Sequence, residues 1–571
     1  MFRRFVLVPA LVGLLVGFSA VVFVESLELV TELVLGKLVG YYPPLPAGEG
    51  ERPFFTPYPL HPYLLPLTVA LGGLFSGLVA RYLAPESAGV GTDKAIRAYH
   101  YGEPLSLRSS LAKLVSSAVT IGTGGTSGRE GPIALIGAGL GSFLAQKLKL
   151  GEYERRQALA VGLGAGVAAV FRAPLAGAVI SGEVFFKKDF NVEAMVPGFF
   201  ASAVSYAVFG SFYGFSPIFE LEVPPFKEEG LLSLAAFAGL GVVCALGARL
   251  LVELFLRTSA FFASLPLPPV VKPAVGGLLA GAVGALFPPA IGNGYGWLQL
   301  VMDGVIKEPL FTLLSALAVV LGVSLTVGSG GSGGVFGPSV MAGGLLGASY
   351  ALSLNELLGL SLDVPSFTVV GMVALFAGAA KAPLSTIILV AEMTGGYELL
   401  LPSMLAVFIT YFLSGEKSIF PSQLDTRADS PAHAEEFGLH VLELLRVEDY
   451  MSKNLFTVEP ETSVKEALEL MAKKLVGGLP VVKDGKLVGI VTRGDLTKVP
   501  EELRRRLKVS QVCTREVVTV SPKATLAEVL RVMTARGIGR LPVVKDGKLV
   551  GIIARADLGR AVREHARRRT A

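Results

Sequence analysis

The stretch GTGGTSGREGP, residues 122–132, interrupts one of the most apolar parts of the chain and carries two adjacent charged residues. Glycine and proline both disfavour a continuous helix, so a membrane segment is expected to break here. A closely similar stretch, GSGGSGGVFGP, returns at residues 328–338 and is again followed by apolar residues. Pro132 and Pro338 suit the first turn of a helix, so we expect a new helix to begin at each break.

A second motif repeats in the same order. RAPLAGAVISGE at residues 172–183 follows the first break, and KAPLSTIILVAE at residues 381–392 follows the second. The chain therefore contains two halves, at about 60–220 and 265–415, that arose by duplication. Breaks at corresponding places in two halves are typical of transporters whose binding site lies near the middle of the membrane.

The composition indicates a membrane protein with a soluble tail. Of the 571 residues, 52% are hydrophobic and 17% are charged, whereas soluble proteins carry about a quarter charged residues. Apolar stretches long enough to span a bilayer, about 20 residues each, recur up to residue 415. The first of them is interpreted as a membrane helix rather than a signal peptide, with Arg3 and Arg4 on the cytoplasmic side. We expect an integral protein of the plasma (cell) membrane.

Other classes of function have little support in the sequence. The net charge of +5 is modest, and the arginine runs at 504–506 and 567–569 are interpreted as solvated surface, so no nucleic-acid partner is expected. The two cysteines and five scattered histidines form neither a disulfide framework nor a metal-ligand pattern. A nucleophile–base pair is not recognisable either, so we expect neither an enzyme nor a required cofactor.

The paired breaks predict an anion site. Each break exposes the N-terminus of the following helix, where free N–H groups and the positive end of the helix dipole attract anions. Glycine lets the backbone approach the ion closely, and two such helix starts need no lysine. The alternative is that the glycines only pack helices tightly. That alternative does not explain the matched prolines, or why Glu130 stands opposite Phe336 in the repeat.

Glu130 is predicted to act as a gate. An ionisable side chain inside a membrane segment is costly and usually functional. At the mouth of an anion site, an ionised carboxylate competes with the anion for the same positive potential, and it can leave when it is protonated. The alternative is a structural ion pair with the neighbouring Arg129.

The tail contains a repeat of its own after a linker at residues 426–445. GGLPVVKDGKLVGIVTRGDL at residues 477–496 returns as GRLPVVKDGKLVGIIARADL at residues 539–558. Each copy predicts a β-hairpin with Asp-Gly at its turn, preceded by an amphipathic helix. We expect two α/β units, residues 446–500 and 508–571, that pack as a pair because one alone is too small for a secure core.

These two units resemble CBS domains. The resemblance implies a cleft for an adenine nucleotide (ATP, ADP or AMP), with Thr492 facing phosphate and Asp495 holding the ribose. The second unit keeps Asp557 but has Ala554 in place of the hydroxyl, so one competent cleft is expected rather than two. The alternative is a pair that serves only for dimerisation.

The membrane half resembles the CLC family of chloride channels and proton–chloride exchangers. The motifs GREGP, RAPLAG, GGVFGP and EMTGGYELLLP occur in that order across most of residues 60–425. The resemblance implies a polytopic α-helical membrane domain of two inverted repeats with broken helices, at residues 1–425, followed by the cytoplasmic CBS pair. It also implies a homodimer with one chloride pathway per subunit, and Glu130 as the external gating glutamate.

The resemblance further implies which residues bind chloride: Gly89, Val90, Val335, Phe336 and Phe420. Three positions depart from the family pattern. Val90 replaces a serine hydroxyl and Phe420 a tyrosine hydroxyl, each of which would contribute about 1.5–3 kcal/mol to binding a charged ligand. Val184 stands where coupled exchangers often carry an inner proton-transfer glutamate.

These departures favour chloride transport that is channel-like or uncoupled, under the control of a nucleotide-responsive tail. A proton-coupled exchanger that uses water in place of the missing relay is the alternative. A CBS-regulated divalent cation transporter is an alternative from another class. A cation pathway would require clustered membrane carboxylates rather than helix N-termini.

Overall fold

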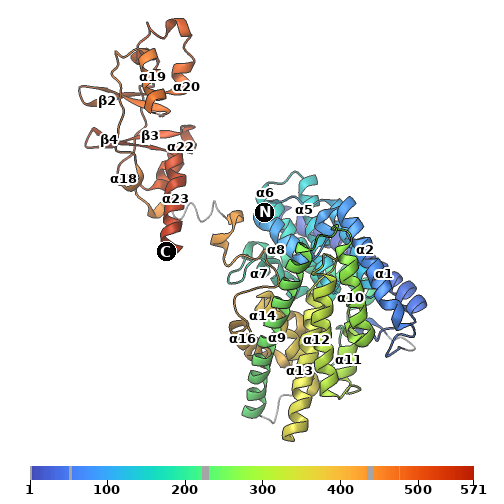
Figure 1. The fold of residues 1–571 in the computed structure, drawn as a ribbon. Helices are drawn as coiled ribbons and strands as arrows, with labels where there is room; N and C mark the ends of the chain where they lie inside the picture. The colour runs from blue at the N-terminus through green and yellow to red at the C-terminus, as the bar shows by residue number, and fades with distance from the viewer. Residues whose placement is uncertain (1–2, 51–54, 222–229, 434–441, 475, 571) are drawn as a thin grey trace. The chain divides into compact units, whose positions relative to one another are not determined.

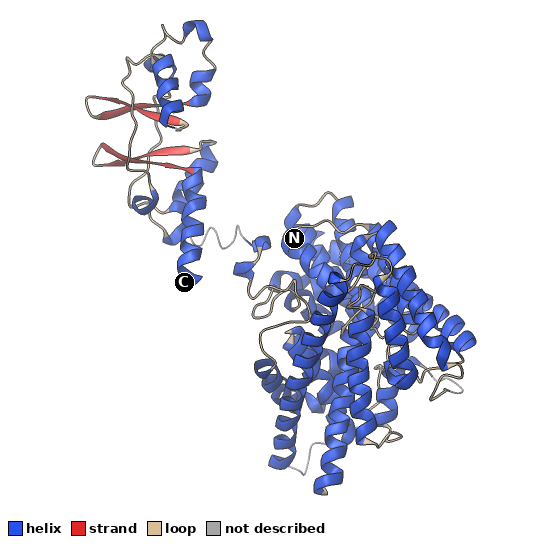
Figure 2. Cartoon of the chain, viewed as in Figure 1, coloured by secondary structure: helices blue, strands red, loops and turns tan. Residues whose placement is uncertain are grey.

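The computed structural model describes residues 3–50, 55–221, 230–433, 442–474 and 476–570. These residues form two compact units, Met1–Ala432 and His433–Ala571. The first unit is almost entirely helical, whereas the second contains both helices and strands (Figure 2).

The α-helices of the first unit are drawn in Figure 1 in chain order. They are α1 (Val8–Thr31), α2 (Leu65–Tyr82), α3 (Gly91–Tyr101), α4 (Leu107–Gly122), α5 (Glu130–Lys147), α6 (Glu152–Phe171), α7 (Pro174–Glu183), α8 (Val192–Tyr213), α9 (Gly230–Ser264), α10 (Lys272–Leu286), α11 (Tyr295–Met302), α12 (Pro309–Thr326), α13 (Phe336–Leu358), α14 (Val364–Ala380), α15 (Pro383–Thr394) and α16 (Leu400–Leu413). Helices begin at Glu130 and Phe336, inside the two motifs where the breaks are predicted.

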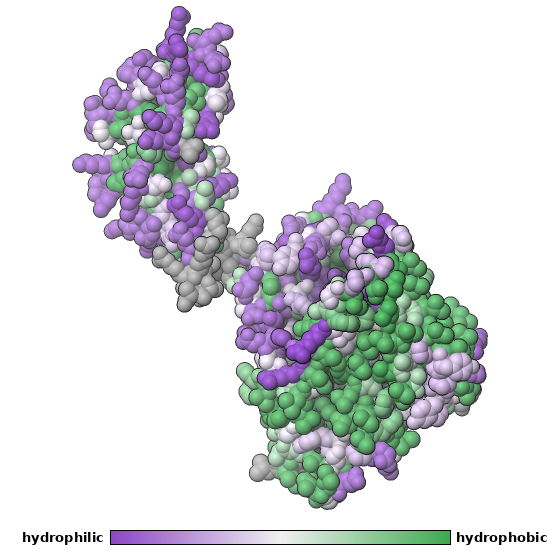
Figure 3. Space-filling view, viewed as in Figure 1, coloured by the Kyte–Doolittle hydropathy of each residue, from purple (hydrophilic) through white to green (hydrophobic). Residues whose placement is uncertain are grey.

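The first unit has the surface of a membrane protein. Five helical stretches among its described residues are long and apolar enough to span a bilayer: Phe5–Val39, Pro62–Tyr82, Val192–Tyr213, Leu232–Ser264 and Pro309–Thr326. Hydrophobic side chains form a broad band over the face shown in Figure 3. Because large apolar residues cover this surface, we assign it to contact with lipid tails.

The two halves pack in equivalent ways. In the first half α5 packs against α6, and in the second α13 packs against α14. A Cβ atom on Gly137 would lie 2.1 Å from the carbonyl oxygen of Gly162, and one on Gly343 would lie 2.4 Å from that of Gly371. These glycines therefore permit close helix contact, as the packing interpretation predicts for this part of each repeat.

The RAPLAG-type motifs place the helices α7 and α15 next to each other. The carboxylate of Glu183, at the end of α7, accepts hydrogen bonds from the first-turn amides of α15, and Glu392 of α15 does the same for α7. The donors and distances are Leu384 N (3.0 Å) and Ser385 N (2.7 Å) for Glu183, and Leu175 N (3.1 Å) and Ala176 N (2.9 Å) for Glu392. Each half thus satisfies otherwise unpaired N–H groups of the other.

The second unit consists of two similar α/β repeats. Its elements are α18 (Val447–Tyr450), α19 (Val464–Lys474), β1 (Gly478–Lys483), β2 (Lys486–Thr492), α20 (Arg493–Thr497), α21 (Val509–Val512), α22 (Leu526–Arg536), β3 (Arg540–Lys545), β4 (Lys548–Ala554) and α23 (Arg555–Thr570). The antiparallel hairpins β1–β2 and β3–β4 turn at Asp484–Gly485 and Asp546–Gly547, where all four residues have positive φ. The Asp-Gly hairpins predicted from the sequence are therefore present.

The two repeats of this unit are interlocked. Ser452, which precedes the first repeat's hairpin, pairs with Ile552 of β4, and Thr514, which precedes the second hairpin, pairs with Ile490 of β2. Each repeat also has a separate cluster of buried apolar side chains. The exchanged backbone pairing explains why the repeats pack as one unit.

Candidate functional site

Three glycine-rich loops pair through their backbones and bring several helix N-termini together. Gly333 N donates to Gly89 O at 3.3 Å, and Gly128 N donates to Gly334 O at 3.0 Å. The loops lead directly into α3, α5 and α13. The two predicted breaks, which are about 200 residues apart in the sequence, are therefore in contact.

The carboxylate of Glu130 occupies the start of α13. Its Oε2 accepts a hydrogen bond from Gly337 N at 3.2 Å, and its Oε1 accepts one from the hydroxyl of Tyr295 at 2.7 Å. Glu130 is only 1% exposed. The carboxyl group of Glu130 therefore lies on a backbone amide at the positive end of a helix, which is the environment predicted for an anion.

Arg129, the neighbour of Glu130 in the sequence, forms its ion pair with Glu49. Its guanidinium makes this buried contact with a residue of the segment that follows α1. It also lies 6.0 Å from the centre of the Tyr295 ring. The structural ion pair that was considered for Glu130 is thus made by Glu49, and the Glu130 carboxylate remains directed at α13.

A small cavity of about 30 Å³ lies beside the Glu130 carboxylate. About 10–15 Å³ is enough for one water molecule, so the cavity has room for a single small anion. Its lining includes four residues singled out from the sequence, namely Glu130, Val184, Phe336 and Phe420. The structure therefore gathers the predicted gate, two predicted chloride ligands and the predicted relay position around one space.

The other predicted chloride ligands lie in the loops around this cavity. Gly89 and Val90 belong to the loop that pairs with residues 330–333, and Val335 directly precedes α13. The cavity lining contains Thr92, two residues beyond Val90, and Ser385 from the start of α15. Two residues that carry hydroxyl groups, Thr92 and Ser385, thus border the space, although the serine and tyrosine of the family pattern are replaced.

The ring of Phe336, in the cavity wall, packs against two other aromatic rings. The ring of Phe336 lies 3.9 Å from that of Phe376 and 4.7 Å from that of Phe171, centre to centre. An aromatic pair at the Phe171–Phe336 distance contributes about 0.5–1.5 kcal/mol beyond the burial of its surface. Phe336 is thereby fixed at the first position of α13, next to its free amides.

Phe420 is positioned by polar neighbours that the sequence analysis did not identify. Asp93 of α3 accepts hydrogen bonds from the backbone N (2.8 Å) and hydroxyl (3.0 Å) of Ser422. The amide of Gln423 donates to the carbonyl oxygens of Val184 and Ala380, both at 2.9 Å. The Phe420 segment is therefore tied to α3, α7 and α14 without a hydroxyl on residue 420.

Lys113 is a second residue near the site that the sequence analysis missed. Its side chain is fully buried in α4, and its Nζ donates to the carbonyl oxygens of Ser87 (3.1 Å), Gly89 (2.7 Å) and Gly333 (3.4 Å). The amine of Lys113 thus joins two of the three site loops through hydrogen bonds. The sequence does contain one sign of this lysine's importance, because Lys113 is the one charged residue in the stretch 109–122.

Tyr295 separates the gate from a second, larger cavity. This cavity has a volume of about 240 Å³ and is lined by Tyr295 together with the charged residues Glu28, Glu49 and Arg129. Asn293 also lines it, and its Oδ1 is buried without a hydrogen-bond partner among the described residues. The hydroxyl of Tyr295 therefore links the Glu130 carboxylate to the wall of a polar vestibule.

The predicted nucleotide residues of the second unit cap helices. Asp495 Oδ2 accepts from the backbone N (2.9 Å) and hydroxyl (2.6 Å) of Thr492 at the start of α20. Asp557 accepts from Ala554 N at 2.8 Å and from the guanidinium of Arg560 at 2.9 Å. These contacts are a structural role that each aspartate fulfils without any ligand.

Two arginines lie close to Thr492. Arg493 directly follows it, and the guanidinium of Arg540 lies so close to Gly478 that a Cβ there would be 2.6 Å from Nη1. Burial lowers the pKa of Arg540, and the charge of Arg493 lowers it further. A phosphate between the guanidinium groups of Arg493 and Arg540 would relieve the repulsion between them, so this is a suitable place for a phosphate group.

Comparisons with known proteins agree with this arrangement. Residues 72–415 match the family model of voltage gated chloride channels, and residues 447–502 and 509–564 match the CBS domain model. An H(+)/Cl(−) exchange transporter, ClcA of Salmonella paratyphi B, is 30% identical over 423 residues, which cover 72% of this chain and 86% of that protein. Chloride channel protein CLC-f of Arabidopsis thaliana is 28% identical over 516 residues, which cover 77% and 65% of the two chains.

The same fold occurs in a solved structure. The crystal structure of a slow cyanobacterial Cl−/H+ antiporter superposes with a TM-score of 0.63 at 23% identity, covering 74% of this chain and 97% of that chain. Together with the two CBS matches, this likeness confirms the predicted fold class, a helical membrane domain with broken helices followed by an α/β pair.

Proposed function

The chain belongs to the voltage-gated chloride channel family, as its motifs predict, and we propose on this premise that it carries chloride across a membrane along a pathway closed by Glu130. The observation that carries the proposal is the Glu130 carboxylate on the amide of Gly337, at the first turn of α13. That amide is one of the donors an anion would use. The carboxylate and chloride therefore compete for one place.

The gate follows from the chemistry of this contact. A hydrogen bond to a charged group contributes about 1.5–3 kcal/mol, and the ionised carboxylate receives two, from Gly337 N and the hydroxyl of Tyr295. Protonation removes the charge that both contacts stabilise. The side chain can then leave the start of α13, and a chloride ion can take its place beside Phe336.

We propose that transport is channel-like or only weakly coupled to protons. The small cavity beside Glu130 is bounded by the apolar side chains of Val184 and Phe420. Neither side chain can pass a proton. A proton-coupled exchanger is the second candidate, because Salmonella ClcA is named as an exchange transporter and water could connect the cavity to the cytoplasm.

A chloride gradient across liposomes is therefore expected to drive little or no uphill proton movement through the wild-type protein. The reason is that proton transfer toward Glu130 needs an ionisable group or ordered water, and Val184 supplies neither. The measurement is external pH after the gradient is imposed, with proton leak controlled in protein-free liposomes. Sustained proton pumping at a fixed ratio to chloride, abolished by Glu130→Gln, would establish the exchanger instead.

We also propose that the CBS pair binds an adenine nucleotide through the cleft at Thr492 and Asp495. The two arginines near Thr492 support this role over a dimerisation module alone. Asp495→Ala is expected to weaken ATP, ADP or AMP binding about tenfold, which corresponds to 1.4 kcal/mol, and more than Asp557→Ala does. Calorimetry on the full-length protein measures both effects. Asp495→Asn keeps a capping oxygen and controls for loss of the helix cap, and absence of binding to any adenine nucleotide leaves only the dimerisation role.

Assembly and orientation are proposals that rest on the family. We propose a homodimer with one chloride pathway per subunit, and an N-terminus and CBS pair on the cytoplasmic side. Light scattering on the purified protein should give twice the chain mass of 59.8 kDa. A particle with the mass of one chain would exclude the dimer.

A further inference from the structure

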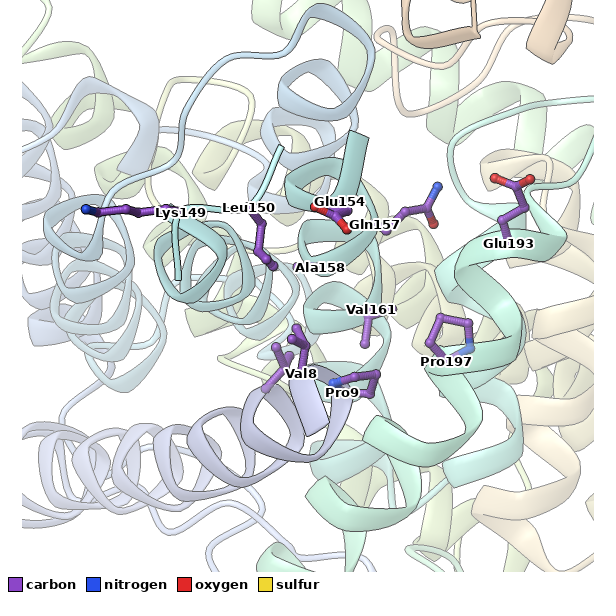
Figure 4. Close-up of a pocket in the computed structure, with 11 residues that line it drawn as sticks. Val8, Pro9, Lys149, Leu150, Glu154, Gln157, Ala158, Val161, Glu193 and Pro197 are labelled. Atoms are coloured by element: carbon purple, nitrogen blue, oxygen red, sulfur yellow. The ribbon is translucent and has the colours of Figure 1, made fainter. Parts of the chain in front are cut away.

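A cavity of about 350 Å³ lies between α1, α6 and α8, and its lining shares no residue with the small cavity at Glu130 (Figure 4). Val8 and Pro9 of α1 and Pro197 of α8 form an apolar side of this cavity. Glu154 and Gln157 of α6, with Glu193 of α8, form a polar side. Figure 4 shows the two sides separated, with the polar groups gathered at one end.

At the polar end of the cavity, the side-chain oxygen of Gln157 lacks a hydrogen-bond donor among the described residues. The residue is 7% exposed. In Figure 4 its amide lies between the carboxylates of Glu154 and Glu193. A buried acceptor without a donor is unfavourable, so this end of the cavity is suited to a ligand that donates hydrogen bonds.

The two carboxylates are only partly engaged by the protein. Glu154 accepts a hydrogen bond from Gly151 N at 3.1 Å, and Glu193 accepts one from the hydroxyl of Tyr153. Within the described part of the chain, neither forms an ion pair with a lysine or arginine. Lys149 also lines the cavity, but Figure 4 shows its amine pointing away from the carboxylates.

We propose that this cavity binds a phospholipid with a primary ammonium head group, such as phosphatidylethanolamine. The three N–H donors of the ammonium match the three acceptors Glu154, Gln157 and Glu193. The fatty-acid chains would lie along the apolar side formed by Val8, Pro9 and Pro197. A choline head group has no N–H to donate, and an anionic head group would be repelled by the carboxylates.

The apolar side argues for a lipid rather than a water-soluble amine. A free polyamine could satisfy the same three acceptors, but it would leave Val8, Pro9 and Pro197 uncovered. These residues belong to helices that are long and apolar enough to span the bilayer. A ligand with a cationic head and apolar chains covers both sides of the cavity.

The test is native mass spectrometry of the full-length protein with phosphatidylethanolamine, phosphatidylcholine and phosphatidylglycerol offered in equal amounts. The wild-type protein is expected to retain phosphatidylethanolamine at least about fivefold over the other two. The double variant Glu154→Gln with Glu193→Gln is expected to lose this preference. Glu152→Gln is the matched control, because Glu152 lies on the same helix but pairs with Arg156 outside the cavity.

A second variant covers the case in which the double variant does not fold. Gln157→Leu removes the unpaired acceptor while keeping a side chain of similar size, so it should fold and still lose the preference. Equal retention of the three lipids by the wild-type protein would overturn the proposal, as would a preference that survives Gln157→Leu. Binding of spermine without phosphatidylethanolamine would assign the cavity to a soluble amine instead.

Discussion

Replacing Glu130 with Gln is expected to keep or increase chloride flux and to remove most of its dependence on pH. The amide has the shape of the protonated carboxyl, so it mimics the open gate at every pH. It carries no charge and is therefore a weaker competitor than the carboxylate for the amide of Gly337 at the start of α13. The measurement is chloride efflux from liposomes across a range of external pH, wild type against variant.

Tyr295→Phe is the matched control for this experiment. It removes the 2.7 Å hydrogen bond to the Glu130 carboxylate but leaves the titratable group in place. Its flux should therefore still change with pH. A Glu130→Gln protein that is well folded but inactive, or whose flux retains the wild-type pH profile, would show that Glu130 is not the gate.

Lys113→Met is expected to weaken chloride binding at least about tenfold, or 1.4 kcal/mol. Methionine fills a similar volume but leaves the carbonyl oxygens of Ser87, Gly89 and Gly333 without their shared donor. The loops are then expected to separate, so the helix N-termini that follow them no longer point at one position for the anion.

The measurement is calorimetric titration with chloride in the Glu130→Gln background, where the gate does not occupy the site. Lys147→Met provides the control, because Lys147 is exposed at the opposite end of α5 from Glu130. Unchanged chloride affinity in a folded Lys113→Met protein would assign the lysine a purely structural role.

The parts of the site that could be predicted from sequence are those encoded locally. A glycine-rich break followed by proline indicates a helix start, and the duplication predicts two such starts at corresponding places in the two halves. Glu130 stands out because a carboxylate in an apolar segment is costly. Phe336 is found by its equivalent place in the repeat.

The remaining parts depend on residues that are distant in sequence and have no pattern of their own. Tyr295 reaches Glu130 from 165 positions away, and Glu49 pairs with Arg129 from a loop after the first membrane helix. Thr92 lines the cavity because α3 begins at Gly91, a helix start that no break motif marks. Such contacts are set by how the helices pack, and periodicity carries no information about them.

The exchanged glutamates of α7 and α15 have a consequence for how this domain could have arisen. Because Glu183 satisfies amides of α15 while Glu392 satisfies amides of α7, a single half would leave both a carboxylate and a helix start unpaired within the membrane. A one-half ancestor could meet that cost by associating with a second copy of itself. Fusion of two gene copies would then have joined the two halves covalently. Since then, the hydrogen-bond partners of each glutamate have been encoded in the other half of the sequence.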